Sequence, residues 1–345
     1  MSEDLQALQQ KTGDSIIWEN TFDDWDQWDE LLEFIENGQC ILMLGPNISA
    51  SPDNDKPYIE LFSETLVERL KIPGLNPSDY SKVASTYKHL KTSSQFHNRV
   101  KKFYGQNLTS AKTFQYIAKM PFPLIINTSP DHLLKEAYDN AIFDYYNYKS
   151  NRKEPTSSGT SKHPLVYNLF GSAVEPESLI ITEKDRLDFL VNSIKRDPPL
   201  PKNLLSEKIM NNEKMFLFVG FDFNEWYLRL LLNILSLNND RFACAIDRHD
   251  VETNQETRVF YTHNFNLSFL DAPFDIFIHK LYLKYAEKNP LLKLVEESTD
   301  GSNITIRKDM RMATKHFFSN TDSNIIKRKT LFFLRYLSIE NHLKK

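Results

Sequence analysis

Cysteine is scarce in this sequence: only Cys40 and Cys244 occur among 345 residues. Each lies in or beside an apolar run, so we expect both thiols to be buried. Two isolated cysteines provide neither a disulfide framework nor the cysteine pattern of a zinc site. The nine histidines also lack the spacing that metal ligands show. The sequence therefore predicts no metal site.

Long apolar runs are also absent. No run approaches the ~20 residues that a helix needs to cross a bilayer. Residues 1–15 are polar and acidic, unlike the apolar centre of a secretory signal. We therefore expect a cytoplasmic protein that does not enter a membrane.

The sequence has no excess of basic residues. Its formal net charge is −4, which argues against a protein built around nonspecific binding of nucleic acid. Hydrophobic residues make up 41% of the chain and charged residues 26%, so a packed core is expected. The length suits one large α/β domain with an extension, or two modest domains.

What the sequence does contain is an alternation of short apolar runs and segments of helical periodicity. Each apolar run ends in a glycine or a polar cluster, and a helix usually follows. The expected strands are 40–44, 122–126, 141–148, 164–170, 215–219 and 241–246. The expected helices are 57–70, 81–119 with a break near 92–94, 132–138, 185–194 and 226–237. This order predicts an α/β fold with a doubly wound, Rossmann-like parallel sheet.

The two ends of the chain differ from this central pattern. Residues 1–38 are acidic and aromatic, and 26–36 has helical spacing with Trp28, Leu31, Leu32 and Ile35 on one stripe. We expect this helix to pack on the domain formed by residues 39–288. Residues 289–345 are basic, with helical periodicity over 324–343. That helix could dock on the acidic segment, a partner or nucleic acid, and packing within the protein or between subunits is favoured.

Four predicted turns follow apolar strands and are expected to share one edge of the sheet. Ligands of doubly wound sheets bind beyond the carboxyl ends of the strands. The four turns are Gly45–Ser49, Asn127–Asp131, Gly171–Ser172 and Gly220–Asn224. Their convergence favours a nucleotide site more than any one turn does alone.

The first of these turns has the composition of a phosphate-binding loop. Gly45 can adopt positive φ values, and Asn47 is the next most tolerant residue type. Ser49 could cap the following helix and donate to a phosphate, whereas Pro46 has no N–H to donate. A plain strand-to-helix turn is the alternative interpretation of Gly45–Ser49.

Five segments, in order, resemble the motifs of sirtuins and SIR2-like proteins. The resemblance extends from about residue 38 to about residue 285. Leu44–Ser49 resembles the Gly-Ala-Gly-x-Ser loop, Ile126–Asp131 resembles Thr-x-Asn-x-Asp, Asn168–Ser172 resembles Lys-Leu-His-Gly-Ser, Ile180–Asp185 resembles Ile-Thr-x-x-Asp-Tyr, and Leu217–Trp226 resembles Leu-Phe-x-Gly-Tyr-Ser-x-Asn-Asp-Trp. The similarity is greater to the bacterial antiviral-defence branch, whose members hydrolyse NAD, than to deacetylases, which usually carry a four-cysteine zinc module.

The resemblance implies NAD as substrate or ligand, no metal, and either a homo-oligomer or a complex with a defence partner protein. It implies contacts to NAD from Gly45, Pro46, Asn47, Ser49, Thr128, Phe170, Gly171, Ser172, Gly220, Asp222 and Asn224. Asp222 and Asn224 would contact the adenosine half, or would cap the helix that begins near Trp226. The implied catalytic positions are Asn127, Ser129 and Asp131.

The sequence departs from the family at two catalytic positions. Ser129 stands where the family has an asparagine that holds the nicotinamide ribose and the attacking water. Phe170 stands where it has a histidine, and a phenylalanine cannot accept a proton. Asp131 matches the family, Asn127 is a candidate replacement for the missing amide, and His132, directly after Asp131, is a candidate base.

Two functions follow from these observations. The first is an NAD hydrolase, because cleavage of an N-glycosidic bond depends mainly on a shaped and electrostatically suited pocket. The second is a catalytically degenerate SIR2-like module that binds NAD, a related nucleotide or a partner protein in a regulatory or scaffold role. Matching residues outside the catalytic positions, such as Thr182 and Asp185, favour a nucleotide pocket in both.

Overall fold

The computed structural model describes residues 25–289, apart from 107, 110–111, 139, 148–158, 196–199, 202–203, 205–208, 210–212, 236, 238–240 and 248–252. Packing divides the chain into a unit that ends at Lys284 and a second that starts at Tyr285. The sheet and the candidate site lie in the first unit. The basic helix predicted at 324–343 lies outside the described residues, and the domain limits at 38 and 288 stay predictions.

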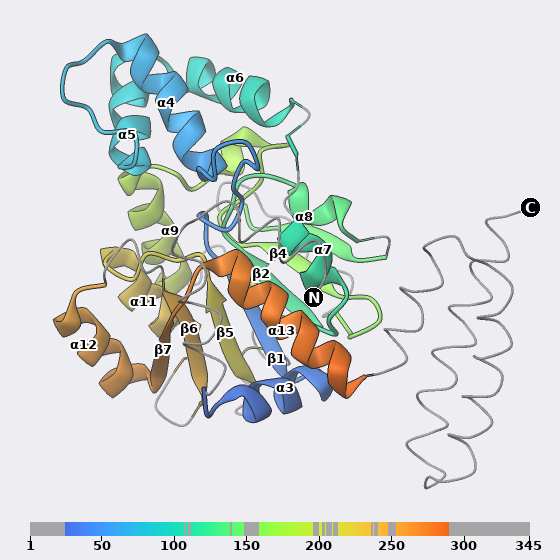
Figure 1. The fold of residues 1–345 in the computed structure, drawn as a ribbon. Coiled ribbons are helices and arrows are strands. Elements are labelled where there is room, and N and C mark those ends of the chain that lie inside the picture. The colour runs from blue at the N-terminus through green and yellow to red at the C-terminus, as the bar shows by residue number, and fades with distance from the viewer. Residues whose placement is uncertain are drawn as a thin grey trace, which may run out of the picture. The chain divides into compact units, whose positions relative to one another are not determined.

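The described residues form one seven-stranded sheet in the order β3-β4-β2-β1-β5-β6-β7. Every neighbouring pair of strands is parallel, which confirms the predicted doubly wound α/β fold (Figure 1). The strands are β1 Cys40–Leu44, β2 Leu124–Asn127, β3 Ile142–Tyr145, β4 Leu165–Asn168, β5 Met215–Val219, β6 Ala243–Asp247 and β7 Leu267–Asp271.

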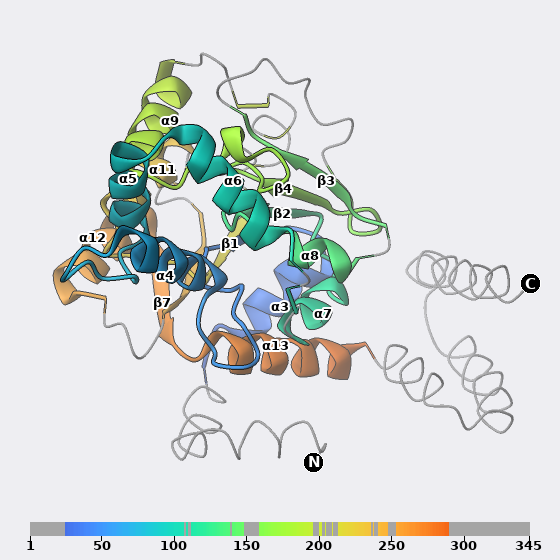
Figure 2. The same ribbon diagram turned by 90° about the horizontal axis from the view of Figure 1, so that it is seen from above.

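Helices cover both faces of this sheet (Figure 2). One face carries α3 Trp28–Glu36, α7 Lys112–Ala118 and α13 Phe274–Lys288, and the other carries α9 Glu183–Lys195, α11 Trp226–Ile234 and α12 Gln255–Phe265. The short α8 Leu133–Glu136 and the 3₁₀ helix Pro176–Ser178 follow β2 and β4. Every residue of β1 and β5 is buried, as expected for central parallel strands.

Several sequence predictions are confirmed in this core. In α3, Trp28, Leu31, Leu32 and Ile35 are the buried residues, so the predicted amphipathic helix packs on the domain. Cys40 and Cys244 are both buried and free. The sequence did not predict β7, whose Leu-Ser-Phe-Leu-Asp run is less uniformly apolar than the central strands.

Three of the helices between β1 and β2 form an insert near the carboxyl edge of the sheet (Figure 1). They are α4 Tyr58–Leu70, α5 Tyr80–Leu90 and α6 Ser93–Tyr104. Apolar side chains of these helices form a separate cluster with the segment after β4, and this cluster contains Ile59, Phe62, Leu66, Val83, Ala84, Tyr87, Phe96, Val100, Ala173, Leu179 and Ile181. We call α4–α6 the helical insert.

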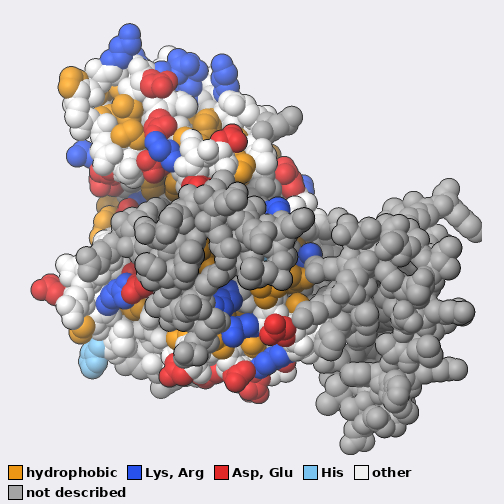
Figure 3. All heavy atoms as spheres, viewed as in Figure 1, with side chains coloured by type: hydrophobic (Ala, Val, Ile, Leu, Met, Phe, Trp, Pro, Cys, Tyr) orange, Lys and Arg blue, Asp and Glu red, His pale blue; other side chains and the backbone are white. Residues whose placement is uncertain are grey.

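The outer side of the helical insert is polar. Lys82, Lys91, Lys101 and Lys102 are exposed, and Lys and Arg side chains gather at the top of the molecule in Figure 3. A polar outer side and an apolar inner side fix which way these amphipathic helices face. The insert is therefore held against the rest of the domain by its apolar side.

Gly45 offers a direct test of how closely the turns at the sheet edge approach each other. A Cβ atom at Gly45 would lie 2.1 Å from the carbonyl oxygen of Gly220. We predict that Gly45→Ala lowers the free energy of unfolding by roughly 3 kcal/mol or more. The atoms that the added Cβ would meet belong to the backbone of Gly220 and Phe221, which cannot move aside as a flexible side chain can. Chemical denaturation measures this loss.

Gly74→Ala is the matched control. Gly74 has a φ of +77°, but nothing lies within 4 Å of an added Cβ. Its substitution should cost only the backbone term of about 1 kcal/mol. Equal losses for the two variants would contradict the steric explanation for Gly45.

Candidate functional site

The turns that follow β1, β2, β4 and β5 meet at one edge of the sheet, as predicted. The N–H of Gly45 donates to the carbonyl of Val219 at 2.8 Å, and that of Thr128 donates to Leu44 at 2.9 Å. The N–H of Leu169 donates to Asn127 at 2.8 Å, which links β4 to β2. The strand order reverses between β1 and β5, and ligands of such sheets bind at this switch point. We call these four turns the rim.

The Gly45 turn differs from the prediction in its geometry. Positive φ values occur at Gly171 and Gly220, but Gly45 and Asn47 are not among the residues with positive φ. Gly45 is required instead because its Cα lies against the backbone of Gly220. This close approach joins residues far apart in the sequence, so the local pattern could not indicate it.

The predicted helix cap by the Ser49 side chain is wrong. Helix α4 begins at Tyr58, its N-cap residue is Pro57, and no side chain caps it. The buried Ser49 takes part through its backbone, because its carbonyl accepts the N–H of Tyr58 at 2.8 Å. The turn therefore has no helix N-terminus directly behind it.

Three amides of the first turn already have acceptors within the protein. Gly45 donates to Val219, Asn47 donates to Gly220 at 3.2 Å, and Ile48 donates to Gly45 at 3.3 Å. Pro46, which is buried, has no N–H. A diphosphate at this turn would have to be bound by side chains such as those of Asn47 and Ser49 rather than by these amides.

The turn after β2 is a closed hydrogen-bond network around Asn127. Its Nδ2 donates to the Ser129 carbonyl at 3.3 Å and to Oδ1 of Asn168 at 3.2 Å, while its Oδ1 accepts the N–H of Ser129 at 3.1 Å. The Asn127 amide is therefore engaged in shaping the turn. Asn168, which the sequence analysis missed, lies inside the segment that resembles Lys-Leu-His-Gly-Ser.

Asp131 and Ser129 form a buried pair at the centre of the rim. The Ser129 hydroxyl donates to Oδ2 of Asp131, and the N–H of Leu133 donates to Oδ1 at 3.1 Å. Both residues are nearly inaccessible to solvent, at 2% and 3% exposed. Thr128 is held away from this pair, because its hydroxyl donates to the Leu44 carbonyl at 2.9 Å. The pair thus gives the turn after β2 a buried carboxyl group.

In the turn after β4, Phe170 is part of the core. Its ring packs edge to face against Phe189 at 5.5 Å and Tyr227 at 5.7 Å. Gly171 has a φ of +80°, and an added Cβ would lie 2.3 Å from the Ser178 carbonyl. Phe170 is therefore a packing residue of the core.

A histidine does reach this turn from another direction. Nε2 of His132 lies 3.0 Å from the Ser172 hydroxyl, which also accepts the N–H of Val174 at 3.2 Å. Burial lowers the pKa of His132 below its ordinary value, Asp131 opposes this shift and Lys135 adds to it. His132 is therefore a neutral imidazole near pH 7, beside the carboxylate of Asp131.

The fourth turn of the rim follows β5. Oδ1 of Asp222 accepts the N–H and the side-chain Nδ2–H of Asn224, at 2.9 and 3.1 Å, and Oδ1 of Asn224 accepts the N–H of Asn254 at 3.2 Å. The alternative prediction, that Asp222 or Asn224 caps α11, is wrong. The N-cap residue is Glu225, without a side-chain cap.

The sequence analysis missed a buried arginine behind this turn. Arg186 of α9 is 2% exposed, donates to Oε2 of Glu225 at 3.0 Å and to the Tyr80 hydroxyl at 2.6 Å, and lies 4.4 Å from the ring centre of Tyr227. Burial opposes its charge, but Tyr80, Tyr227 and Glu225 raise the pKa of Arg186 above its ordinary value. The sequence pattern that could have indicated Arg186 is its position directly after Asp185, the last residue of the segment that resembles Ile-Thr-x-x-Asp-Tyr.

Thr182 and Asp185 attach the helical insert rather than line the rim. The two residues exchange hydrogen bonds at the start of α9, at 3.1 and 3.2 Å. Nζ of Lys88 in α5 lies 2.9 Å from Oδ2 of Asp185. Burial raises the pKa of Asp185, but Lys88 and the Thr182 bonds together hold it below its ordinary value.

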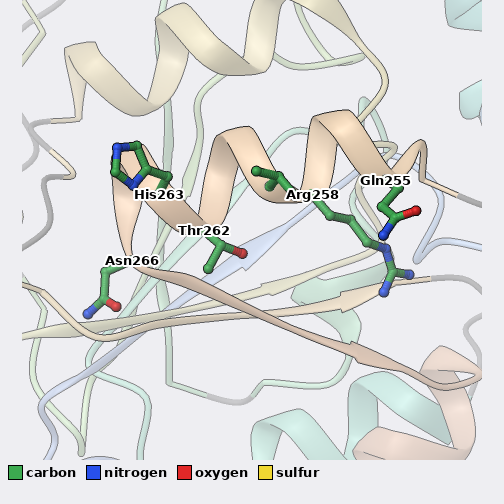
Figure 4. A pocket seen from close by; sticks show the side chains of 6 residues that line it. Gln255, Arg258, Thr262, His263 and Asn266 are labelled. Carbon is green, nitrogen blue, oxygen red and sulfur yellow. The ribbon is translucent and has the colours of Figure 1, made fainter.

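A separate hollow lies along α12 and is not part of the rim (Figure 4). It is lined by Gln255, Arg258, Val259, Thr262, His263 and Asn266. Arg258 is already neutralised, because it pairs with Asp247 at 2.8 Å and with Asp271. A hollow along one helix, without turns that converge on it, is a weaker candidate than the rim.

Two further findings bear on ligands and location. The described residues contain no group of three or more His, Cys, Asp or Glu side chains that could hold a metal ion. In that same part of the chain, no helix combines the length and apolar character needed to cross a membrane.

His132 leads to a prediction about pH. Because its pKa is lower in the folded state than the ordinary 6.5, the unfolded chain binds the proton more tightly. The free energy of unfolding should therefore fall as the pH drops below about 6.5. In His132→Gln, the difference in stability between pH 7.5 and pH 5.5 should be smaller than in the wild type. Urea titrations at the two pH values measure this, and an undiminished difference would contradict the assignment.

Comparison with known protein families finds one match. Residues 123–270 match the family model of the SIR2-like domain. The match includes the turns after β2, β4 and β5, while the turn after β1 precedes it. No curated protein matches the chain. The chain thus combines a Rossmann-like α/β fold with a segment, residues 123–270, that is similar to the SIR2-like domain, a type of domain with NAD-related function.

Proposed function

We propose that the rim binds NAD and that the protein hydrolyses the bond between nicotinamide and ribose. The observation that carries the proposal is the buried Ser129–Asp131 pair at a rim where four turns meet. The similarity of residues 123–270 to the SIR2-like domain supports NAD as the ligand. Gly45, Asn47, Ser49, Gly220, Asp222 and Asn224 would surround the phosphates and the adenosine half.

The reaction needs a negative charge and an oriented water. The bond from ribose C1′ to the pyridinium nitrogen breaks, and its electron pair neutralises the nicotinamide ring. The oxocarbenium-like sugar that remains is stabilised by a nearby carboxylate, and Asp131 provides one that is excluded from solvent. Water then bonds to C1′ and gives up a proton, and in this proposal Ser129 orients that water.

The base in this scheme is His132. Its imidazole is neutral near pH 7 and follows Asp131 directly, so it can accept the proton from water. Asn127 acts as a positioning residue, because its amide is engaged with Ser129 and Asn168. This assignment replaces a direct role of Asn127 in holding the ribose.

A second function is favoured by the packing of Phe170. With that ring in the core and the Asn127 amide engaged, the rim could bind NAD without cleaving it. The protein would then be a regulatory or scaffold module. For either function, the resemblance to defence-associated proteins supports a role in bacterial antiviral defence, in the cytoplasm, as a homo-oligomer or beside a partner protein.

Replacing Asp131 tests the enzymatic proposal. We predict that the wild type releases nicotinamide from NAD and makes an etheno-NAD analogue fluorescent. Asp131→Asn should be slower by about 100-fold, because a buried charge near the sugar is removed. Fluorescence and chromatography of free nicotinamide measure both rates.

Asp188→Asn is the matched control. Asp188 lies in α9, where its carboxylate pairs with Lys184 at 2.8 Å on an exposed side of the helix. The Asp188→Asn variant should turn over NAD as fast as the wild type. If the wild type shows no turnover but NAD raises its melting temperature, the binding module is correct. If NAD neither reacts nor stabilises the protein, both functions that involve NAD are wrong, and a scaffold that binds a partner protein remains.

A further inference from the structure

The outer side of α9 and α11 carries exposed hydrophobic side chains. Among the residues that the structure describes, eight large hydrophobic side chains are exposed, and five of the eight lie on these two helices. The five are between 37% and 62% exposed, and they are Leu187, Val191 and Ile194 of α9 and Trp226 and Leu230 of α11. Single exposed hydrophobic residues are common, whereas a group of them on neighbouring helices indicates a binding surface. We call these five residues the outer apolar patch.

The patch is one surface because the two helices are neighbours. Helices α9 and α11 pack side by side on one face of the sheet (Figure 2). Arg186 of α9 donates to Glu225 at the start of α11 at 3.0 Å, and its guanidinium lies 4.4 Å from the ring centre of Tyr227. Other side chains of both helices are buried against the core, so the exposed ones point away from the sheet.

In α9, the patch residues follow the helical repeat. Leu187, Val191 and Ile194 are spaced i, i+4 and i+7, which places them in a stripe along one side of the helix. The opposite side of α9 is also apolar, because Phe189 and Leu190 belong to the core. A helix that is apolar on two sides is expected to be covered on both. The stripe therefore has the form of a helix–helix contact surface.

Charges along α9 indicate which partner covers the patch. Glu183 and Lys195, the first and last residues of α9, are exposed and of opposite charge. Lys184 and Asp188 neutralise each other at 2.8 Å. The two signs are thus balanced, which does not suit a nucleic acid or a strongly charged protein. A second α9 in antiparallel orientation would place each acidic end beside a basic end.

We propose that the outer apolar patch is the contact surface of a twofold dimer of this protein, in which α9 of one copy packs antiparallel on α9 of the other. Around a twofold axis at the middle of α9, Leu187 of each copy faces Val191 of the other. The ends then pair Glu183 with Lys195. The inference goes beyond the proposed function, because it does not require that the rim binds NAD.

The patch residues of α11 fit the same arrangement. The pair of Arg186 and Glu225 joins the start of α11 to the start of α9, so Trp226 lies near this end of α9. In an antiparallel dimer, the last turn of the second α9, with Ile194, arrives at the same end. Tryptophan is enriched at protein–protein interfaces, which agrees with its exposure here.

Val191→Glu tests the proposal on the full-length protein, without NAD. We expect the wild type to sediment with twice the mass of one chain. The variant should dimerise at least about 100-fold more weakly, because each dimer would bury two additional charges. Glutamate favours a helix at least as well as valine, and Val191 is partly exposed, so the variant should fold. Sedimentation equilibrium measures the association, and thermal melting followed by circular dichroism checks the fold.

Val174→Glu is the matched control. Val174 is 71% exposed and lies in the segment after β4 rather than on α9 or α11. This variant should dimerise as tightly as the wild type. A monomeric wild type would overturn the proposal and leave another segment of the chain or a different protein as the occupant of the patch. Equal effects of Val191→Glu and Val174→Glu on a dimer would also overturn it, because the copies would then meet elsewhere.

Exchange of the two end charges tests the antiparallel orientation. In Glu183→Lys, each end of the α9 pair would hold two lysines, and the dimer should weaken about tenfold. Adding Lys195→Glu restores opposite charges and should recover most of this affinity. The helix dipole alone predicts no recovery, since each charge would then lie at its unfavourable end. A double variant that dimerises no more tightly than Glu183→Lys would overturn the antiparallel arrangement.

Discussion

The contact on which the candidate site depends is that between the backbones of Gly45 and Gly220. It brings the turns after β1 and β5 together at the point where the strand order reverses. A Cβ at Gly45 would meet the backbone of Gly220, whereas a Cβ at Gly220 would meet the backbone of Ile48, and Gly220 also has a positive φ. The position of the other two turns follows from the ordinary parallel pairing of β2 with β1 and of β4 with β2.

This contact has a chemical consequence for the rim. The amides of Gly45, Asn47 and Ile48 point at protein carbonyls, so the turn is rigid but presents few backbone donors. The polar chemistry is concentrated at the β2 turn, where Asn127 and Asn168 hold Ser129 and Asp131 in place. A site of this kind favours recognition of a sugar over recognition of phosphate by backbone amides.

Much of the fold was predictable because its signals are local. Continuous apolar runs predicted the bounds of β1 and β5 correctly, and the apolar stripe of Trp28, Leu31, Leu32 and Ile35 predicted helix α3. The rim followed from the rule that parallel strands end at one edge. The partners within the site were not predictable. Arg186 and Glu225 are 39 residues apart, and Lys88 and Asp185 are 97 residues apart. Such pairs are set by tertiary packing, which leaves no visible pattern in a single sequence.

Two consecutive residues of α9 bind neighbouring helices. Asp185 pairs with Lys88 of α5. Arg186 pairs with Glu225 at the start of α11 and donates to Tyr80 at the start of α5. These contacts hold α9, α5 and the start of α11 together. A motion that separates one of these elements from the others must therefore break a partly buried ion pair.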